Sequence, residues 1–308
     1  MSEKRISNLA ASVHRRLLNL AREKGEDLQF VLDRYAAERL LYRLSVSEYR
    51  DRFVLKGAAL LAVWSKEAYR ATRDVDLLSW GVSSPESVEP VFRGICRISV
   101  DDDGLRFLED SIVAQEIQEA QEYGGIRVRM SALLGRARAN VQIDVGFGDA
   151  VTPEPEEIEF GGMLGFPPAA LRGYPRESVI AEKLHAMVTL GIANSRMKDF
   201  YDLLYMSRQF DFDGRKLCDA IAATFERRQT TLPRDAPTCL TAGFYEDREK
   251  LGQWSAFIRR SRIGGADAGL SEVCLALREF LLPPMLAAAE GAVFDMFWPS
   301  SGPWSRRE

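Results

Sequence analysis

The stretch over residues 53–80, FVLKGAALLAVWSKEAYRATRDVDLLSW, sets two acidic residues into an otherwise apolar pattern. It predicts a short strand, a break at Gly57, a helix over residues 58–66 and a second strand that carries Asp74 and Asp76. Because side chains alternate along a strand, Asp74 and Asp76 project to the same side. Two carboxylates this close repel each other unless a proton or a cation joins them. The stretch therefore predicts a site for a hard divalent cation, with Mg²⁺ as the expected ion.

The start of the predicted helix is the second informative feature of this stretch. The first turn of a helix leaves backbone N–H groups unpaired and carries the positive end of the helix dipole. Gly57 and Ala58 stand at this start, next to the acidic strand in the chain. We therefore expect the backbone here to receive a phosphate group.

A third carboxylate is expected on a later strand. Residues 105–117 and 125–147 alternate in a way that predicts antiparallel strands, with a turn at Gly135-Arg136. In the last strand, NVQIDVGFGD, Val141, Ile143 and Val145 face one side, and Gln142 and Asp144 face the other. An isolated aspartate in an apolar strand is costly unless a cation or hydrogen-bond donors meet it. Asp144 is thus a candidate metal ligand; the alternative is an aspartate on a solvated strand face.

Composition limits the classes of protein to consider. The chain has 308 residues, 46% of them hydrophobic, and a formal net charge of -4, which excludes a surface that is basic throughout. Its four cysteines are far apart and lack metal-ligand spacing, as expected of reduced core thiols. The N-terminal residues lack the apolar core of a signal peptide, and no stretch is apolar enough for a membrane span. We expect a soluble cytoplasmic protein without a membrane partner.

Two domains are predicted, over residues 1–160 and 161–308. The first opens with two helices within residues 8–44, interpreted as a packing layer over a sheet. A Pro- and Gly-rich segment over residues 152–175 is expected to connect the domains, and the chain beyond it has mainly helical periodicity. The final residues, SSGPWSRRE, are expected to be frayed.

The helical half supplies further candidate residues. Lys183 lies within the apolar stripe of the helix that begins near Glu177, so its charge must either reach solvent or meet negative charge, such as that of a triphosphate. In the next helix Asp199 shares a face with apolar residues and is also expected to point inward. Lys198 and Asp202 are spaced for an ordinary surface pair, so Asp202 is given no role.

Several motifs together resemble a known family. K-G-x-x-L followed by R-x-T-R-D-x-D-L resembles the first motif of nucleotidyltransferases, and A-E-K-L followed by R-x-K-D-F-Y-D-L resembles later motifs of the AbiEii/AbiGii type, which includes the MenT-like toxins. The strings N-L-A-A-S-V, R-D-R-F-V-L-K-G and W-S-A-F-I-R-R-S extend the resemblance over nearly the whole chain. One departure is Ala58, where the superfamily has serine, so that a hydroxyl contact to phosphate is lost.

The resemblance implies an α+β fold: a nucleotidyltransferase mixed sheet with flanking helices, followed by a mainly helical domain that completes the active site. It also implies roles for particular residues. The catalytic residues would be Asp74, Asp76, Lys183 and Asp199; the metal ligands Asp74, Asp76 and Asp144; and the nucleotide-binding residues Lys56, Gly57, Arg70, Thr72, Arg73 and Lys183.

The same resemblance implies a toxin of a toxin–antitoxin system that uses an NTP and Mg²⁺, with Mn²⁺ as a substitute. The implied acceptor is the 3′ end of tRNA, and the implied partner is an AbiEi-type antitoxin encoded nearby; a monomer is expected. Arginines that could follow an RNA backbone are Arg127, Arg129, Arg136, Arg138, Arg227, Arg228, Arg259, Arg260 and Arg262, although arginines at helix ends are also ordinary caps.

Two alternatives stay open. One is a nucleotidyltransferase that modifies a protein or a small molecule, which would share the metal site and differ in its acceptor groove. The other is an inactive nucleotidyltransferase fold used as a binding protein, which is disfavoured because all four implied catalytic residues are present. Hydrolases built on histidine–metal sites or on serine or cysteine triads are disfavoured because the chain has only two histidines and no suitably placed base.

Overall fold

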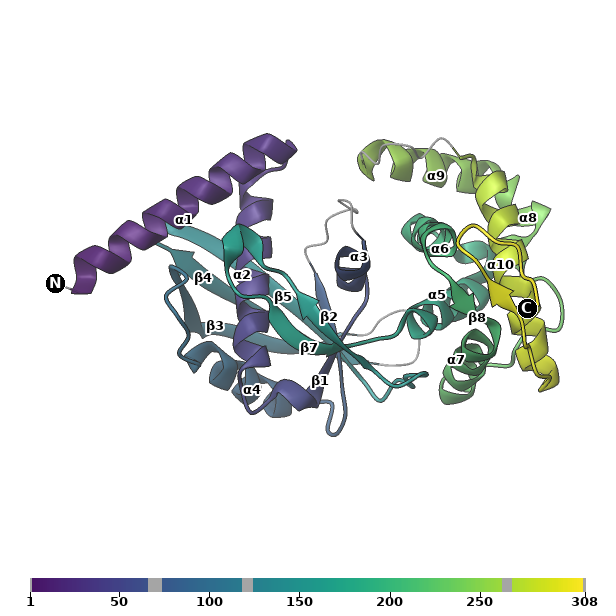
Figure 1. Ribbon diagram of the computed structural model, residues 1–308, viewed down its shortest axis with the longest axis horizontal. Helices are drawn as coiled ribbons and strands as arrows, with labels where there is room; N and C mark the ends of the chain where they lie inside the picture. Colours follow the sequence, from purple (N-terminus) through teal and green to yellow (C-terminus); the bar gives the residue numbers. More distant parts are fainter. Residues whose placement is uncertain (1, 66–73, 118–123, 262–267, 307–308) are drawn as a thin grey trace. The chain divides into compact units, whose positions relative to one another are not determined.

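The computed structural model describes residues 2–65, 74–117, 124–261 and 268–306. The chain folds into two compact units (Figure 1). The first unit comprises residues 1–148 and 156–174, and the second comprises residues 149–155 and 175–308. The chain thus leaves the first unit at residue 148, returns at residue 156 and leaves again after Tyr174.

The first unit is built on a mixed sheet. Its strands are β1 (Phe53–Lys56), β2 (Val75–Ser79), β3 (Leu105–Ile117), β4 (Gly125–Leu134), β5 (Ala137–Phe147), β6 (Glu156–Phe160) and β7 (Ala169–Gly173). In the described residues they form one seven-stranded sheet in the order β3-β4-β5-β2-β1-β7-β6. The pairs β2–β5 and β1–β7 are parallel, and the other neighbouring pairs are antiparallel. The predicted mixed sheet is confirmed.

The β4–β5 hairpin shows how the sequence pattern sets the two faces of this sheet. The turn at Gly135, whose φ is +62°, joins the strands where the sequence predicted it. On one face the apolar side chains are fully buried, among them Ile126, Val128 and Ile143. The opposite face carries polar residues of both strands, among them three arginines and Asp144, and most of these are partly or fully exposed. A shift of one residue in register would exchange the faces, so this pattern fixes the pairing.

Helices cover the apolar face. These are α1 (Ser2–Lys24), α2 (Leu28–Ser45) and α4 (Pro85–Arg97), and Figure 1 shows α1 and α2 beside the strands of the sheet. α1 buries Ala10, Val13, Leu17 and Ala21, which are spaced three or four residues apart. α4 begins in a capping box at Ser84, because the Ser84 hydroxyl accepts from the Ser87 N–H while the Ser87 hydroxyl accepts from the Ser84 N–H.

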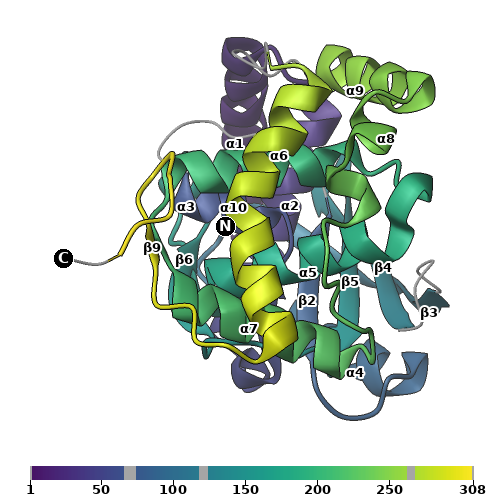
Figure 2. The same cartoon turned by 90° about the vertical axis from the view of Figure 1, so that its right-hand side faces the viewer.

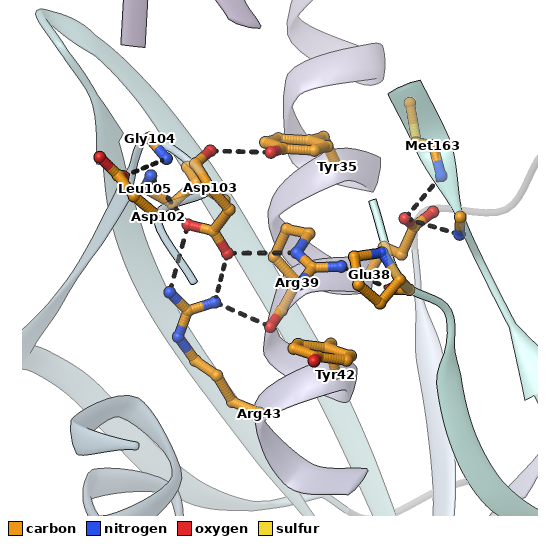
Figure 3. Close-up of polar contacts among 12 residues, drawn as sticks. Tyr35, Glu38, Arg39, Tyr42, Arg43, Asp102, Asp103, Gly104, Leu105 and Met163 are labelled. Atoms are coloured by element: carbon orange, nitrogen blue, oxygen red, sulfur yellow. Dashed lines mark hydrogen bonds and ion pairs between the residues drawn. The ribbon is translucent and has the colours of Figure 1, made fainter. Parts of the chain in front are cut away.

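α2 also carries a buried charge cluster (Figure 3). Asp103 accepts two hydrogen bonds from Arg43 and one from Arg39, at distances between 2.7 and 3.2 Å. Asp103 and Arg39 are each 1% exposed. On the other side of the helix, Glu38 accepts from the backbone N–H groups of Gly162 and Met163. The helix therefore fastens two distant loops as well as covering the sheet, and the sequence pattern of a simple packing helix did not predict this.

The second unit is mainly helical, as predicted. Its helices are α5 (Arg176–Leu190), α6 (Met197–Gln209), α7 (Gly214–Arg227), α8 (Ala242–Tyr245), α9 (Arg248–Ser261) and α10 (Leu270–Glu290), and β8 (Phe212–Asp213) pairs with β9 (Phe297–Trp298). α10 packs along α7 and α6 (Figure 2). Among the described helices, none is long and apolar enough to cross a membrane.

Two sequence expectations about connecting segments are wrong. Residues 152–175 are not a plain connection, because they contain β6 and β7, which extend the sheet. Their strand pattern is short and broken by glycines, which hides it in the sequence. The last residues are not frayed as far as they are described: Trp304 stacks on Phe280 and its indole N–H donates to the Phe280 carbonyl oxygen at 2.9 Å.

Candidate active site

Asp76 and Gly57 are brought together by the pairing of β1 with β2. In this antiparallel pair Lys56 is the direct partner of Asp76, so both side chains lie on the same face. Gly57 follows at once and has a φ of +73°, which favours glycine. A Cβ atom on Gly57 would lie 2.0 Å from Oδ2 of Asp76. The bare backbone of Gly57 therefore makes room for the Asp76 carboxylate.

The short helix α3 (Ala59–Trp64) follows Gly57, close to the predicted bounds. Its N-cap residue, Ala58, makes no side-chain capping bond. The superfamily pattern has a serine at this position, and a serine hydroxyl could cap the helix start. Ala58 has no such group.

Asp74 stands immediately before β2 rather than within it, a small correction to the predicted strand. Its side chain is exposed, and Oδ1 accepts a hydrogen bond from Nε2 of Gln142 at 3.2 Å. Gln142 in turn accepts from Nε of Arg129 at 3.1 Å. Asp74 is thus tied to an arginine through a neutral amide.

Asp144 is the register partner of Asp76 in the parallel β2–β5 pair. Its partner across β4 is Arg127, which donates to both carboxylate oxygens, from Nε at 2.7 Å and from Nη2 at 2.6 Å. Across four adjacent strands the sheet therefore presents Lys56, Asp76, Asp144 and Arg127 in one row.

Other predicted nucleotide-binding residues, Arg70, Thr72 and Arg73, lie outside the described residues. Of the predicted RNA-binding arginines, Arg262 also lies outside them. Arg127 pairs with Asp144, and Arg228 contacts Asp149 at 3.2 Å and Glu182 at 3.6 Å. Both of these arginines have carboxylate partners within the protein. The other described members of the set are exposed: Arg129, Arg136, Arg138, Arg227, Arg259 and Arg260.

In the second unit Lys183 points inward, as predicted. Its Nζ donates to Oδ1 of Asp199 at 2.6 Å and to Oδ2 of Asp202 at 2.8 Å. Asp199 is 1% exposed and Asp202 is 0% exposed. Burial alone would lower the pKa of Lys183, but the negative charges of Asp202 and Asp199 outweigh burial and raise the pKa. Lys183 is therefore held as a cation between two aspartates.

The interpretation of Asp202 as one half of a surface pair was wrong. Asp202 is buried against Lys183, while Lys198 is exposed. Asp199 and Asp202 supply the negative charge that Lys183 requires, so no triphosphate is needed for that purpose. The spacing of Asp199 and Asp202, three residues apart on one helix, was the signal that they share a face.

His185, one of the two histidines of the chain, is buried, with 4% of its surface exposed. Its Nε2 lies 2.8 Å from the Thr230 hydroxyl, and Nη1 of Arg228 lies 3.3 Å from its Nδ1. Burial, followed by the charge of Arg228, lowers the pKa of His185 to about 4. The ring is therefore neutral, with Nδ1 accepting from Arg228 and Nε2–H donating to Thr230.

The acidic residues of the sheet are suited to a hard cation. Among the residues that the structure describes, no group of three or more His, Cys, Asp or Glu side chains is arranged to hold a metal ion. Mg²⁺, however, is commonly bound by one or two carboxylates, with water and substrate phosphates completing its coordination. Asp74 and Asp76, the second of which lies against the bare backbone of Gly57, fit this form of site.

A family model for the nucleotidyl transferase AbiEii toxin of type IV TA systems matches residues 39–280. The chain is therefore a nucleotidyl transferase, as the resemblance implied. It belongs to the AbiEii toxin family of toxin–antitoxin systems. Membership implies an NTP substrate and an antitoxin partner.

Comparison with solved structures gives distant matches. JHP933 from Helicobacter pylori is 14% identical, with 82% of this chain and 87% of that chain covered and a TM-score of 0.44. A nucleotidyltransferase described as putative, also from H. pylori, is 14% identical, with 82% and 89% covered and a TM-score of 0.43. A search of curated proteins gives no significant match.

Proposed function

We propose that the protein transfers an NMP group from an NTP to the 3′ end of tRNA in a Mg²⁺-dependent reaction, and so blocks translation. The acceptor hydroxyl gives up its proton to solvent as its oxygen forms a bond to the α-phosphorus. The bond from that phosphorus to the oxygen that bridges the α- and β-phosphates breaks, and pyrophosphate leaves with the electron pair. Such a transfer depends mainly on positioning and on charge stabilisation. Family membership supports the reaction class, and the resemblance to MenT-like toxins supports the acceptor.

The observation that carries the proposal is the close approach of Gly57 to the Asp76 carboxylate. Gly57 has no side chain that could crowd that carboxylate, and Lys56 is the register partner of Asp76 on the neighbouring strand. Asp74 and Asp76 would hold the metal, which when bound would neutralise charge on the phosphates. Lys56 and the backbone at Gly57, with Arg70, Thr72 and Arg73, would bind the triphosphate. Asp144 is the candidate third carboxylate.

Lys183 and Asp199 of the helical unit are proposed to serve the same reaction. Lys183 would act on the nucleotide phosphates, with Asp199 and Asp202 keeping it protonated and fixed. A lysine held between two carboxylates keeps its charge at any physiological pH, which suits a group that must offset phosphate charge throughout the reaction.

The test is to incubate the purified protein with Mg²⁺, each α-³²P-labelled NTP in turn and total tRNA. We expect label on tRNA with a preferred NTP, and a loss of about 100-fold or more in the Asp76→Asn variant. Asp110→Asn, which neutralises an exposed aspartate of β3, is the matched control and should retain full transfer. Label on protein or on a small molecule would overturn the acceptor, and no transfer to any acceptor would overturn the reaction.

A second variant tests the contribution of the helical unit. Lys183→Arg keeps the positive charge that Asp199 and Asp202 require but changes the shape of the cationic group. We expect a folded protein whose transfer rate falls at least about tenfold. Lys216→Arg, at an exposed position of α7, should leave the rate unchanged. Equal rates for both variants would remove Lys183 from the proposed site.

A further inference from the structure

Arg127 and Arg129 are two arginines on the same face of β4 that meet the acidic residues in different ways. Arg127 binds both carboxylate oxygens of Asp144 directly. Arg129 is linked to Asp74 through the side chain of Gln142. From this hairpin Asp144 therefore receives a guanidinium group, and Asp74 receives an amide N–H.

The contact between Arg127 and Asp144 is of a strong kind. Two parallel N–H···O bonds between a guanidinium group and a carboxylate fix geometry and neutralise charge together. Both partners are partly buried, with side-chain exposures of 28% for Arg127 and 15% for Asp144, which limits screening by water. A cation that approaches Asp144 therefore meets a carboxylate whose charge is already balanced.

This arrangement agrees with the absence of a three-ligand metal cluster among the described residues. Asp76 and Asp144 are register partners on adjacent strands, so strand pairing alone would favour a site that both share. In the structure Asp144 is instead bound by Arg127 in a salt bridge.

We infer that Arg127 is a positioning residue that withholds Asp144 from the metal in the nucleotide-free protein, leaving Asp74 and Asp76 as the metal ligands. The inference rests on the metal site of the proposed function and adds the residue that limits its affinity. Its consequence is weak metal binding before the nucleotide supplies phosphate oxygens.

Binding of Mn²⁺ to the nucleotide-free protein, followed by the electron paramagnetic resonance signal of free Mn²⁺, tests the inference without requiring catalysis. Arg127→Gln removes the salt bridge and frees a carboxylate beside Asp76, so we expect Mn²⁺ to bind about tenfold more tightly than to the unaltered protein. Arg129→Gln removes the same charge from the same face without freeing a carboxylate. Its affinity should stay within about twofold of the unaltered protein.

Two further variants separate the salt bridge from a general effect of charge. In an Asp144→Asn background, adding Arg127→Gln should change the Mn²⁺ affinity no more than Arg129→Gln does. Arg127→Lys keeps the charge but loses the two parallel bonds, and should fall between the unaltered protein and Arg127→Gln. Circular dichroism confirms that each variant is folded.

The outcomes distinguish the inference from the function on which it rests. If Mn²⁺ binding depends on Asp76 but is unchanged or weaker in Arg127→Gln, the inference is wrong and Arg127 either has no effect on the metal or supports Asp144 as a ligand. Tightening of equal size in Arg127→Gln and Arg129→Gln would also overturn it. If Asp76→Ala has no effect on Mn²⁺ binding, the metal site itself is wrong, and the inference fails with it.

Discussion

A Cβ atom on Gly57 would stand 2.0 Å from the Asp76 carboxylate oxygen Oδ2, so these two residues fit together only because residue 57 has no side chain. Gly57 also has a φ of +73°, a conformation that costs other residues about 1 kcal/mol or more. Two separate constraints, one steric and one conformational, therefore require glycine at this position.

The two constraints on Gly57 can be separated by comparison with Gly25. Gly25 has a similar φ of +63°, but a Cβ there would meet no atom within 4 Å. We expect both Gly57→Ala and Gly25→Ala to lose about 1 kcal/mol of stability because of the positive φ. Gly57→Ala should lose more, because Asp76 must move, and should lower nucleotidyl transfer at least about tenfold. Thermal unfolding and transfer assays on both variants provide the measurement. Equal activity in the two variants would show that the approach to Asp76 has no catalytic consequence.

Asp202→Asn should destabilise the helical unit, because it removes one of two carboxylates that bind buried Lys183. Breaking a buried ion pair from one side costs about 3 kcal/mol. Lys198→Ala, on the exposed side of the same helix, should cost less than about 0.5 kcal/mol. Urea unfolding of both variants measures the difference, and equal small losses would indicate that Asp202 serves as a surface residue after all.

His185 should make stability depend on pH in acid. Its pKa is about 4 in the folded protein against an ordinary value of 6.5, so below pH 6.5 the unfolded chain binds a proton that the folded chain does not. Stability should therefore fall by up to about 3 kcal/mol as the pH falls from 6.5 to 4, and this contribution should level off below pH 4. His185→Gln should flatten the profile in that range. A slope unchanged by His185→Gln would contradict the assignment.

Asp103→Asn should strongly destabilise the first unit. It leaves Arg39 and Arg43 buried without the carboxylate that both bind (Figure 3), at an expected cost of about 3 kcal/mol or more. The neighbouring Asp102→Asn is the matched control, since Asp102 is exposed and an asparagine oxygen can still accept from the Gly104 N–H. That variant should stay within about 0.5 kcal/mol of the unaltered protein. Chemical denaturation gives both values, and similar values would mean that Asp103 contributes little net stability.

Local patterns predicted much of this fold. The alternation over residues 105–147 and the glycine at residue 57 identified strands and a turn, because each depends on neighbours close in the chain. Lys183 and Asp199 were also correctly expected to point inward.

The partners of these residues could not be predicted in the same way. The salt bridge of Arg127 with Asp144 requires the register of β4 and β5, and the contact of Lys183 with Asp202 requires the packing of α5 against α6. From the sequence, Arg127 and Lys183 were expected to contact phosphate groups. Their carboxylate partners are 17 and 19 residues away in the chain, too far for a local pattern to show the pairing. Charge partners across elements are set by tertiary structure, so composition and periodicity do not show them.

The return of the chain at residue 156 also determines how the protein can be divided. β6 joins the sheet only through β7, and β7 lies next to β1, so a fragment that ended at residue 160 would leave β6 without its neighbour. A fragment carried on to residue 174 would complete the sheet but would also contain residues 149–155, which belong to the second unit. Neither unit is one uninterrupted stretch of sequence. A single cut anywhere in the chain therefore divides at least one of the two units.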